Sequence, residues 1–410
     1  MADGPLSPML AYEDAVARIL EATPVTDRET IPLDKAARRI LAAKVSASVD
    51  QPPHAVSSMD GYAISLSEAD RDPNQRFAVV GEVAAGDPPG TVIVGPGQAA
   101  RIFTGAPIPA GADSVVIQEN TTSHRDGTIT FEGPVVGGSH IRPKAYDFSK
   151  DQEVIEVDTE LRSAHLSLLA AAGHSEVCVV RKPRVAIIST GNELVAPGNK
   201  PMPGQIIASN AVGIGALVEK FGGEPINFGI ARDDLEALTT AFISANEQKA
   251  DIIVTLGGAS VGDHDLVCPA LENIGAVLDF WKVAVRPGKP LMFGQLRGAR
   301  ILGLPGNPVS SLVCAHIFLQ PLLKRLLGQP AVVAMNIGVL DQPLPGNGPR
   351  RHFMRAMIVG VKDGLTLVRP LMDQDSSLLT NLSCADVLIS VSPHHGEMCA
   401  GARCEYLTLE

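Results

Sequence analysis

The sequence predicts a multidomain α/β protein whose largest domain is a doubly wound, mainly parallel sheet. Strand-like and helix-like segments alternate between residues 185 and 327, which is typical of a parallel sheet covered by helices. Short β-rich runs separated by glycine and proline fill residues 52–140 and indicate a separate all-β module. The chain has 410 residues, which is enough for about two to four domains.

Helical patterns are expected on both sides of the β module. Four apolar residues recur at helical spacing near the start of the chain: Leu10, Val16, Ile19 and Leu20. Further helices are expected at 34–44 and 161–172. We therefore expect residues 1–50 and 141–180 to form one discontinuous helical and linker domain.

The β-rich inserted domain is expected to span residues 51–140. Its predicted strands are short apolar runs between Gly/Pro turns. They lie at residues 77–80, 91–94, 100–103, 114–117 and 128–131. A second group of short β runs follows residue 328 and predicts a small C-terminal β domain at residues 329–410.

The α/β domain is expected at residues 181–328, where the apolar pattern switches repeatedly between strand and helix. The expected strands are 185–189, 226–230, 251–256, 277–285 and 301–304. The expected helices are 209–221, 235–245, 266–273 and 309–327. This alternation predicts crossover connections and hence a parallel sheet with helices on both faces.

Composition excludes several classes of protein. There are 34 Lys and Arg against 45 Asp and Glu, so the net charge is −11 and a nucleic-acid or anionic-lipid partner is not expected. The start of the chain lacks the pattern of a signal peptide, and the apolar runs are too short to span a bilayer. Six cysteines without a Cys-x-x-Cys pair suit a reducing cytoplasm. We expect a soluble, cytoplasmic protein.

Ligands of open α/β sheets bind beyond the carboxyl ends of the strands, so the loops there are the candidate sites. In the loop at 257–265, glycines can turn backbone N–H groups toward an anion, and Asp263 and Asp265 are spaced for Mg²⁺. The alternative is an ordinary glycine turn in which an aspartate caps the next helix. The loop is not a Walker A sequence, and no Gly-x-Gly-x-x-Gly follows the first strand, which disfavours ATPase and dinucleotide functions.

Two later loops could also meet an anion. Lys282, Arg286 and Lys289 place three cations within eight residues, and the Pro-Gly turn between the last two could aim them at one oxyanion. Asn307 followed by Pro308 is typical of a helix start with free N–H groups that could hold phosphate. Surface cations beside a turn and simple helix capping are the alternatives.

Six motifs in a fixed order make the chain recognisable. They are Ser-Met-Asp-Gly-Tyr-Ala at 58–63, Thr-Gly-Ala-Pro-Ile-Pro at 104–109, Ser-Thr-Gly-Asn-Glu-Leu at 189–194, Gly-Gly-Ala-Ser-Val-Gly-Asp at 257–263, Arg-Pro-Gly-Lys-Pro at 286–290 and Leu-Pro-Gly-Asn-Pro-Val-Ser at 304–310. The sequence resembles the molybdopterin molybdenumtransferase family, which includes MoeA and the E domain of gephyrin. The resemblance implies a segmented helical domain, an inserted β-rich domain, a molybdopterin-binding α/β domain and a C-terminal β-barrel.

The resemblance also implies an activity. It is the insertion of molybdate into adenylylated molybdopterin, dependent on Mg²⁺ or another divalent cation, with release of AMP and molybdenum cofactor. It implies a homodimer whose active site lies between the α/β domain of one copy and the β module of the other. The molybdopterin adenylyltransferase and molybdoenzyme acceptors are candidate partners. Two alternatives are a molybdopterin adenylyltransferase and a non-catalytic molybdopterin-binding scaffold.

The resemblance assigns site residues position by position. The expected catalytic residues are Asp60, Thr104, Glu193, Asp233, Asp265, Lys282 and Arg286, and the expected metal ligands among them are Glu193, Asp233 and Asp265. The expected ligand-binding residues are Arg142, Asp147, Gly257, Gly258, Ser260, Gly262, Lys289, Pro305, Gly306, Asn307, Pro308, Arg355 and Ser376. Three places depart from the family pattern: Asn192 replaces a frequent Asp, the run 263–266 replaces a Glu-Ala-Asp-Tyr type sequence, and Arg286 replaces the usual Lys.

Overall fold

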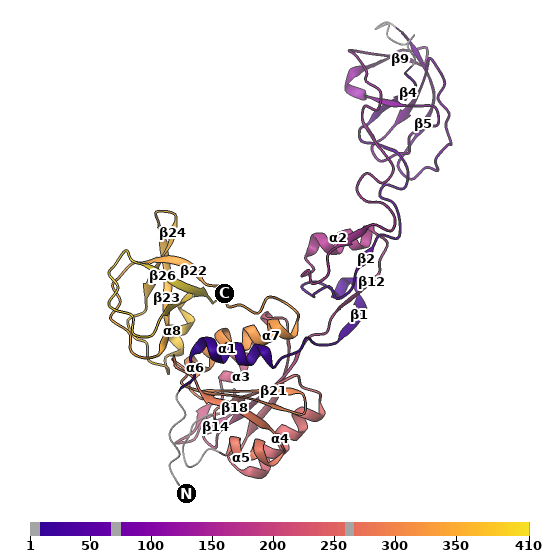
Figure 1. Ribbon diagram of the computed structural model, residues 1–410. Helices are drawn as coiled ribbons and strands as arrows, with labels where there is room; N and C mark the ends of the chain where they lie inside the picture. Colours follow the sequence, from indigo (N-terminus) through magenta and orange to yellow (C-terminus); the bar gives the residue numbers. More distant parts are fainter. Residues whose placement is uncertain (1–8, 67–74, 259–265, 410) are drawn as a thin grey trace. The chain divides into compact units, whose positions relative to one another are not determined.

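The computed structural model describes residues 9–66, 75–258 and 266–409. The chain forms two compact units: unit 1 comprises Met1–Arg28 and Val180–Glu410, and unit 2 comprises Glu29–Val179. Figure 1 shows the elements of both units along the chain. None of the helices in the described ranges is long and apolar enough to cross a membrane. The predicted boundaries of the four domains stay a prediction.

The centre of unit 1 is a six-stranded sheet in the order β16-β13-β17-β21-β20-β18. The strands are β13 (Arg184–Thr190), β16 (Glu224–Ala231), β17 (Ile252–Leu256), β18 (Val277–Lys282), β20 (Pro290–Leu296) and β21 (Ala299–Leu304). The first four in the order are parallel, as predicted, and are joined through α3 (Asn210–Lys220), α4 (Leu235–Glu247) and α5 (Val267–Asn273). Their carboxyl ends therefore share one edge of the sheet.

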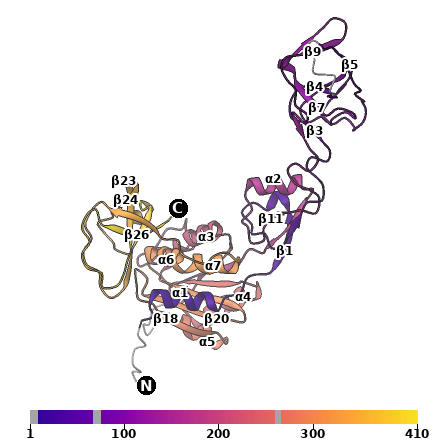
Figure 2. The ribbon, with the colours of Figure 1, turned by 45° about the horizontal axis from the view of Figure 1, so that its top comes forward.

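Helices cover both faces of this sheet, which confirms the doubly wound α/β prediction. On one face, a buried cluster joins α3 to α1 (Tyr12–Glu21), α6 (Pro308–Cys314) and α7 (Gln320–Leu326). On the other face, α4 and α5 supply a second cluster that includes Phe242 and Leu271. Figure 2 shows the two helical layers with the strands between them.

Two features of unit 1 differ from the prediction. Strand β20 was not predicted. It forms a hairpin with β21 through the turn at Arg297 and Gly298, so it runs antiparallel to β21, and it is also antiparallel to its other neighbour, β18. The last helix covers almost the predicted range, but its middle turn, Ala315–Leu319, is π-helical and separates α6 from α7.

The C-terminal region of unit 1 is a closed five-stranded barrel, as the resemblance implied. Its ring is β23-β24-β22-β26-β25, closed by pairing of β25 with β23, and β19 joins β23 at the side. The elements are β19 (Val285–Arg286), β22 (Asn336–Leu340), β23 (Arg351–Lys362), β24 (Leu365–Pro370), α8 (Leu379–Ser383), β25 (Val387–Val391) and β26 (Arg403–Thr408). Because β19 directly precedes β20, the barrel is tied to the α/β sheet by the loop at 287–289.

Unit 2 contains a six-stranded sheet in the order β7-β4-β6-β5-β9-β8. Its strands are β4 (Gly61–Ile64), β5 (Phe77–Val83), β6 (Gln98–Ile102), β7 (Ser114–Ile117), β8 (Thr121–Ser123) and β9 (Thr128–Phe131). Three two-stranded sheets accompany it: β1 (Arg28–Pro32) with β12 (Glu176–Val180), β2 (Val45–Ser46) with β11 (Glu153–Ile155), and β3 (Val56–Ser57) with β10 (Ile141–Arg142). The helical elements are η1 (Leu33–Lys35), η2 (Gln118–Asn120) and α2 (Ser163–Ala171).

Two predicted elements of unit 2 are wrong. The helix at 34–44 is a single turn, η1, because the following backbone bonds with distant chain: the N–H of Leu41 donates to the carbonyl of Thr159. The segment 91–94 is no strand and makes only one isolated bridge, from Ile93 to Ala110. Gly90 and the Gly95-Pro96 pair confine it on both sides.

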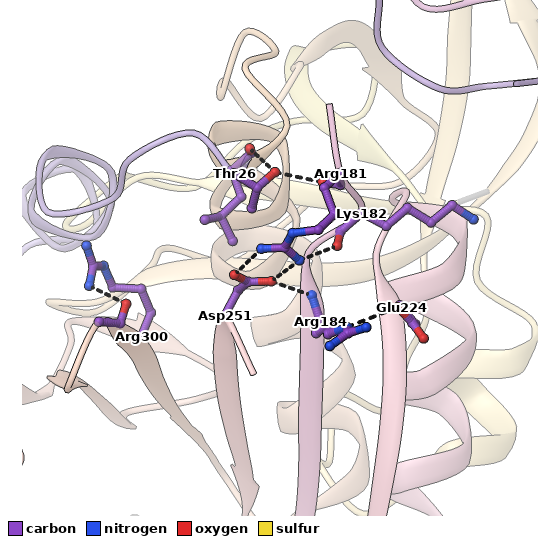
Figure 3. A network of polar contacts seen from close by, with 9 residues as sticks. Thr26, Arg181, Lys182, Arg184, Glu224, Asp251 and Arg300 are labelled. Atoms are coloured by element: carbon purple, nitrogen blue, oxygen red, sulfur yellow. Dashed lines mark hydrogen bonds and ion pairs between the residues drawn. The ribbon is translucent and has the colours of Figure 1, made fainter. Parts of the chain in front are cut away.

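Asp251 anchors the chain beside the boundary between the units (Figure 3). Its carboxylate accepts two hydrogen bonds from the Arg181 guanidinium, at 2.8 and 2.9 Å, and one from the backbone N–H of Arg184 at 2.7 Å. Arg181 also donates its backbone N–H to the carbonyl of Asp27. The two chain segments that enter and leave unit 1 are thus bonded to each other and to the start of β17.

Replacing Asp251 with alanine should lower the stability of unit 1 by about 2–3 kcal/mol, because it removes the carboxylate that accepts from the half-buried Arg181 guanidinium and from the backbone N–H of Arg184. The only tryptophan, Trp281, lies in β18, so its fluorescence during denaturant unfolding reports on this unit. Glu224→Ala is the control, because within the described residues the Glu224 side chain makes only an exposed 3.6 Å ion pair with Arg184, so its loss should cost less than about 1 kcal/mol. An equal loss of stability in Asp251→Ala and Glu224→Ala would contradict the stabilising role of Asp251.

Candidate functional site

A cavity of about 660 Å³ lies where the carboxyl ends of β13, β17 and β21 meet. Its wall includes the residues that directly follow each strand, which is where open α/β sheets place their ligands. The predicted residues that line it are Glu193, Asp233, Gly257, Gly258, Pro305, Gly306, Asn307 and Pro308. The structure therefore brings together eight of the predicted site residues from four separate loops.

The two carboxylates of the cavity come from neighbouring loops. Asp233 is fixed to the loop after β13, because the backbone N–H of Asn192 donates to its Oδ2 at 3.2 Å and the Asn192 Oδ1 accepts the Asp233 N–H at 3.2 Å. The Glu193 carboxylate folds over Gly191, where an added Cβ would lie 2.6 Å from both carboxylate oxygens. Both carboxylates are exposed to the cavity and can receive a cation.

Backbone groups and two asparagines also line the cavity. Asn210, at the start of α3, donates its side-chain amide to the carbonyl of Gly306 at 2.7 Å. Asn307 stands at the N-cap position of α6 but makes no capping bond there; its amide donates to the Ser376 hydroxyl at 2.9 Å instead. Asn307 is thus the N-cap residue, as predicted, but its side chain does not cap the helix and links the cavity to the C-terminal region instead.

Part of the predicted metal-binding loop lies outside the described residues. This applies to Ser260, Gly262, Asp263, His264 and Asp265. Within the described residues, no group of three or more His, Cys, Asp or Glu side chains is arranged to hold a metal ion. Among the described residues, Glu193 and Asp233 are the ones that offer carboxylate oxygens to this cavity, and Mg²⁺ is commonly bound by one or two carboxylates plus substrate phosphates and water. The residues present fit Mg²⁺ bound together with a phosphate ligand.

The predicted cations are placed apart from this cavity. Arg286 lines a second cavity of about 620 Å³ together with loops at 342–348 and 370–375 of the C-terminal region. His352 lines it too, and burial lowers the pKa of His352 to about 4, so it is neutral at pH 7. Lys282 and Lys289 line neither of the two cavities. Arg355 is 1% exposed and donates to the carbonyls of Asp373 and Asp375, so it holds the loop that carries Ser376.

Unit 2 carries four predicted site residues, two of which form one hydrogen-bonded pair. Thr104 donates both its backbone N–H, at 2.7 Å, and its hydroxyl, at 2.9 Å, to Oδ1 of Asp60. These bonds from Thr104, the backbone bond foremost, lower the pKa of the exposed Asp60 carboxyl below its ordinary value. Arg142 and Asp147 are exposed on a separate segment of this unit.

Replacing Thr104 with valine should raise the pKa of Asp60 toward its ordinary value, because the hydroxyl bond is lost while the backbone bond stays. Thr104→Ser keeps a hydroxyl and should keep the lowered pKa. An NMR titration of the Asp60 carboxyl carbon measures both variants. The same titration curve in the unchanged protein and in Thr104→Val would show that the hydroxyl has no part in the shift.

Comparisons with known proteins assign this site to a family. Three family models match in order: the MoeA N-terminal region (domain I and II) over residues 10–173, a probable molybdopterin binding domain over 186–325 and the MoeA C-terminal region (domain IV) over 338–409. A protein of Haemophilus influenzae named molybdopterin molybdenumtransferase is 36% identical over 98% of both chains. The chain belongs to the molybdopterin molybdenumtransferase family. A second member, from Bacillus subtilis, is 32% identical over 93% of this chain and 89% of its own.

Solved structures agree with membership of the molybdopterin molybdenumtransferase family. The crystal structure of a MoeA protein from Pyrococcus horikoshii matches with a TM-score of 0.83 and 31% identity, and covers 98% of this chain and 99% of its own. A second MoeA structure from the same organism matches with a TM-score of 0.80. The family predicted from the six motifs is confirmed.

Some residues of the cavity were not predicted. Thr190, the last residue of β13, and the two isoleucines of β15 (Ile206–Ile207), which pairs with β14 (Leu194–Val195), line the same wall as Glu193. Thr190 lies inside a motif that signals the family, so the sequence held a signal for it. No pattern marked Ile206 and Ile207, because their exposure at the cavity depends on the loop between 196 and 205.

Proposed function

We propose that this protein is a molybdopterin molybdenumtransferase that inserts molybdate into adenylylated molybdopterin and releases AMP. The observation that carries the proposal is the convergence of Glu193, Asp233 and the glycine turn at Gly257 and Gly258 on one cavity in a chain of this family. A phosphate-bearing pterin needs backbone donors and a counter-charge in the same place, and this cavity offers both kinds of group.

In this proposal the chain's residues bind and orient rather than react. Glu193 and Asp233 would hold Mg²⁺, which neutralises phosphate charge when bound. The glycine turn and the Pro305–Pro308 loop shape the floor on which the phosphates lie. The dithiolene sulfurs of the substrate form bonds to molybdenum and displace oxygen ligands of molybdate as water. Water adds across the phosphoanhydride bond between the pterin phosphate and the adenylate, so that AMP and the pterin phosphate are released. The enzyme's contribution is to bring several anions into one orientation.

The proposal includes a homodimer in the cytoplasm. Asp60 and Thr104 belong to unit 2, whereas the cavity belongs to unit 1, and we propose that this pair completes the cavity of a second copy. The six cysteines form no disulfide within the described residues, which suits a reducing compartment. The molybdopterin adenylyltransferase and molybdoenzyme acceptors are the proposed partners before and after this step.

The test is the release of AMP from adenylylated molybdopterin by the purified full-length protein. Release should require both molybdate and Mg²⁺ and should fall to background when either is left out. A parallel reaction with ATP and molybdopterin tests the adenylyltransferase alternative. AMP release that does not depend on molybdate, or adenylylation in the second reaction, would overturn the proposed activity.

A further inference from the structure

The hydroxyl of Thr190 is buried at the wall of the cavity without a hydrogen-bond partner among the described residues. Thr190 ends β13, is 4% exposed and lines the cavity that contains Glu193 and Asp233. Its Oγ1 neither donates nor accepts a hydrogen bond in the described parts of the chain. Buried hydroxyls are nearly always bonded, because desolvation without a partner disfavours the folded state. This hydroxyl therefore calls for a partner that the described residues do not supply.

The glycine turn lies directly against this hydroxyl. A Cβ added at Gly257 would lie 3.0 Å from the Thr190 Oγ1, and one added at Gly258 would lie 3.2 Å from it. Both glycines have positive φ, 101° and 62°, which side-chain-bearing residues rarely adopt. Neither glycine places a side chain between the hydroxyl and the cavity that both residues line, so the ligand proposed below reaches the hydroxyl past bare backbone.

A second buried hydroxyl without a partner gives a comparison within the same sheet. Thr255, on the neighbouring strand β17, is 0% exposed, and its Oγ1 also lacks a partner in the described residues. It lies against Gly303 in the sheet, 3.2 Å from the position of an added Cβ, and it does not line the cavity. Both threonines bury a hydroxyl without a partner among the described residues, but of the two only Thr190 lines the cavity.

We propose that Thr190 binds the ligand by donating its hydroxyl hydrogen to a phosphate oxygen of the nucleotide part of the substrate. The proposal rests on the proposed function, because that function supplies a phosphate ester in this cavity. The position favours phosphate, since a hydroxyl donor stands beside a glycine turn in a cavity that also contains two carboxylates that can hold Mg²⁺. Thr190 thereby adds a ligand contact from β13 to the contacts of the later loops.

The experiment measures AMP binding in Mg²⁺ by calorimetry, and thermal stability without ligand, for three full-length variants. Thr190→Val should bind AMP about tenfold more weakly, which corresponds to about 1.4 kcal/mol, and its Tm without ligand should rise because an unpaired buried hydroxyl is removed. Thr190→Ser should bind like the unchanged protein. Thr255→Val should show the same rise in Tm with unchanged AMP affinity, because its hydroxyl does not meet the ligand.

The outcomes separate the two proposals. If the unchanged protein binds AMP and Thr190→Val binds it equally well, the hydroxyl contact is overturned while the proposed function stands. Equal losses of affinity in Thr190→Val and Thr255→Val would reduce the effect to a disturbance of the sheet and would also overturn the contact. If the unchanged protein does not bind AMP at all, the contact between the hydroxyl and a bound nucleotide is overturned, while AMP release from adenylylated molybdopterin decides the proposed function separately.

Discussion

Asp60→Asn should lower the rate of AMP release from adenylylated molybdopterin by at least about a hundredfold. Asparagine keeps an oxygen that can accept both bonds from Thr104, so the substitution removes the charge and leaves the turn intact. Both bonds go to Oδ1, and within the described residues Oδ2 accepts no hydrogen bond. A carboxylate oxygen held ionised in this way can orient a cation or a metal-bound water at the reacting phosphates.

Asp126→Asn is the matched control for Asp60→Asn. Asp126 is an exposed carboxylate of the same unit, and it too accepts the backbone N–H and the hydroxyl of a threonine, Thr128, at 3.2 and 2.6 Å. Its pKa is lowered by these bonds, as that of Asp60 is by Thr104. The two threonine bonds are of the same kind, and Asp126 differs in pairing its Oδ2 with Arg76 and in belonging to none of the six motifs. A comparable loss of AMP release in both variants would contradict a specific role for Asp60.

Asp233→Asn should lower AMP release by a similar factor, about a hundredfold, and should raise the Mg²⁺ concentration needed for half-maximal release. The substitution removes one of the two carboxylate charges of the cavity, while the amide oxygen can still accept the Asn192 N–H. The shift in the Mg²⁺ requirement distinguishes a lost metal ligand from a distorted loop. It is measured by Mg²⁺ titrations at saturating substrate.

The neighbouring aspartate provides the control for Asp233. Asp234 caps α4 by accepting the N–H of Ala237 at 2.7 Å, so Asp234→Asn changes one adjacent charge and can keep the cap. It should leave the Mg²⁺ requirement unchanged. If Asp233→Asn shows the Mg²⁺ dependence of the unchanged protein, the assignment of Asp233 as a metal ligand is wrong.

The regular part of the α/β domain could be predicted because its local pattern and its tertiary role agree. Strand β17 is a continuous apolar run that is buried on both faces, and α3 and α4 carry their apolar residues on one side. The segment 34–44 failed for the opposite reason. Its backbone bonds with residues more than a hundred positions away, such as Thr159, and no local pattern reports such partners.

The candidate site could be predicted as a set of loops but not as a geometry. Asp233 was expected only from the family resemblance. The rule that ligands bind at the carboxyl ends of parallel strands singled out the loops that carry Glu193, Gly257 and Pro305, and these residues line one cavity. It could not show that Arg286 turns toward the C-terminal cavity or that Arg355 is buried beneath its own loop, because both depend on how the barrel closes. A buried hydroxyl without a partner, such as that of Thr190, is visible only once every neighbour is placed.

The central claim is that Asp60 of one copy and Asp233 of another act in the same reaction, and mixed dimers of the two inactive variants test it most directly. Asp60→Asn and Asp233→Asn chains are co-expressed with different tags and the purified mixture is assayed for AMP release. Random pairing makes about half of the dimers mixed, and each mixed dimer has one intact site out of two. We therefore expect about a quarter of the AMP-release rate of the unchanged protein. A mixture no more active than either variant alone would contradict it.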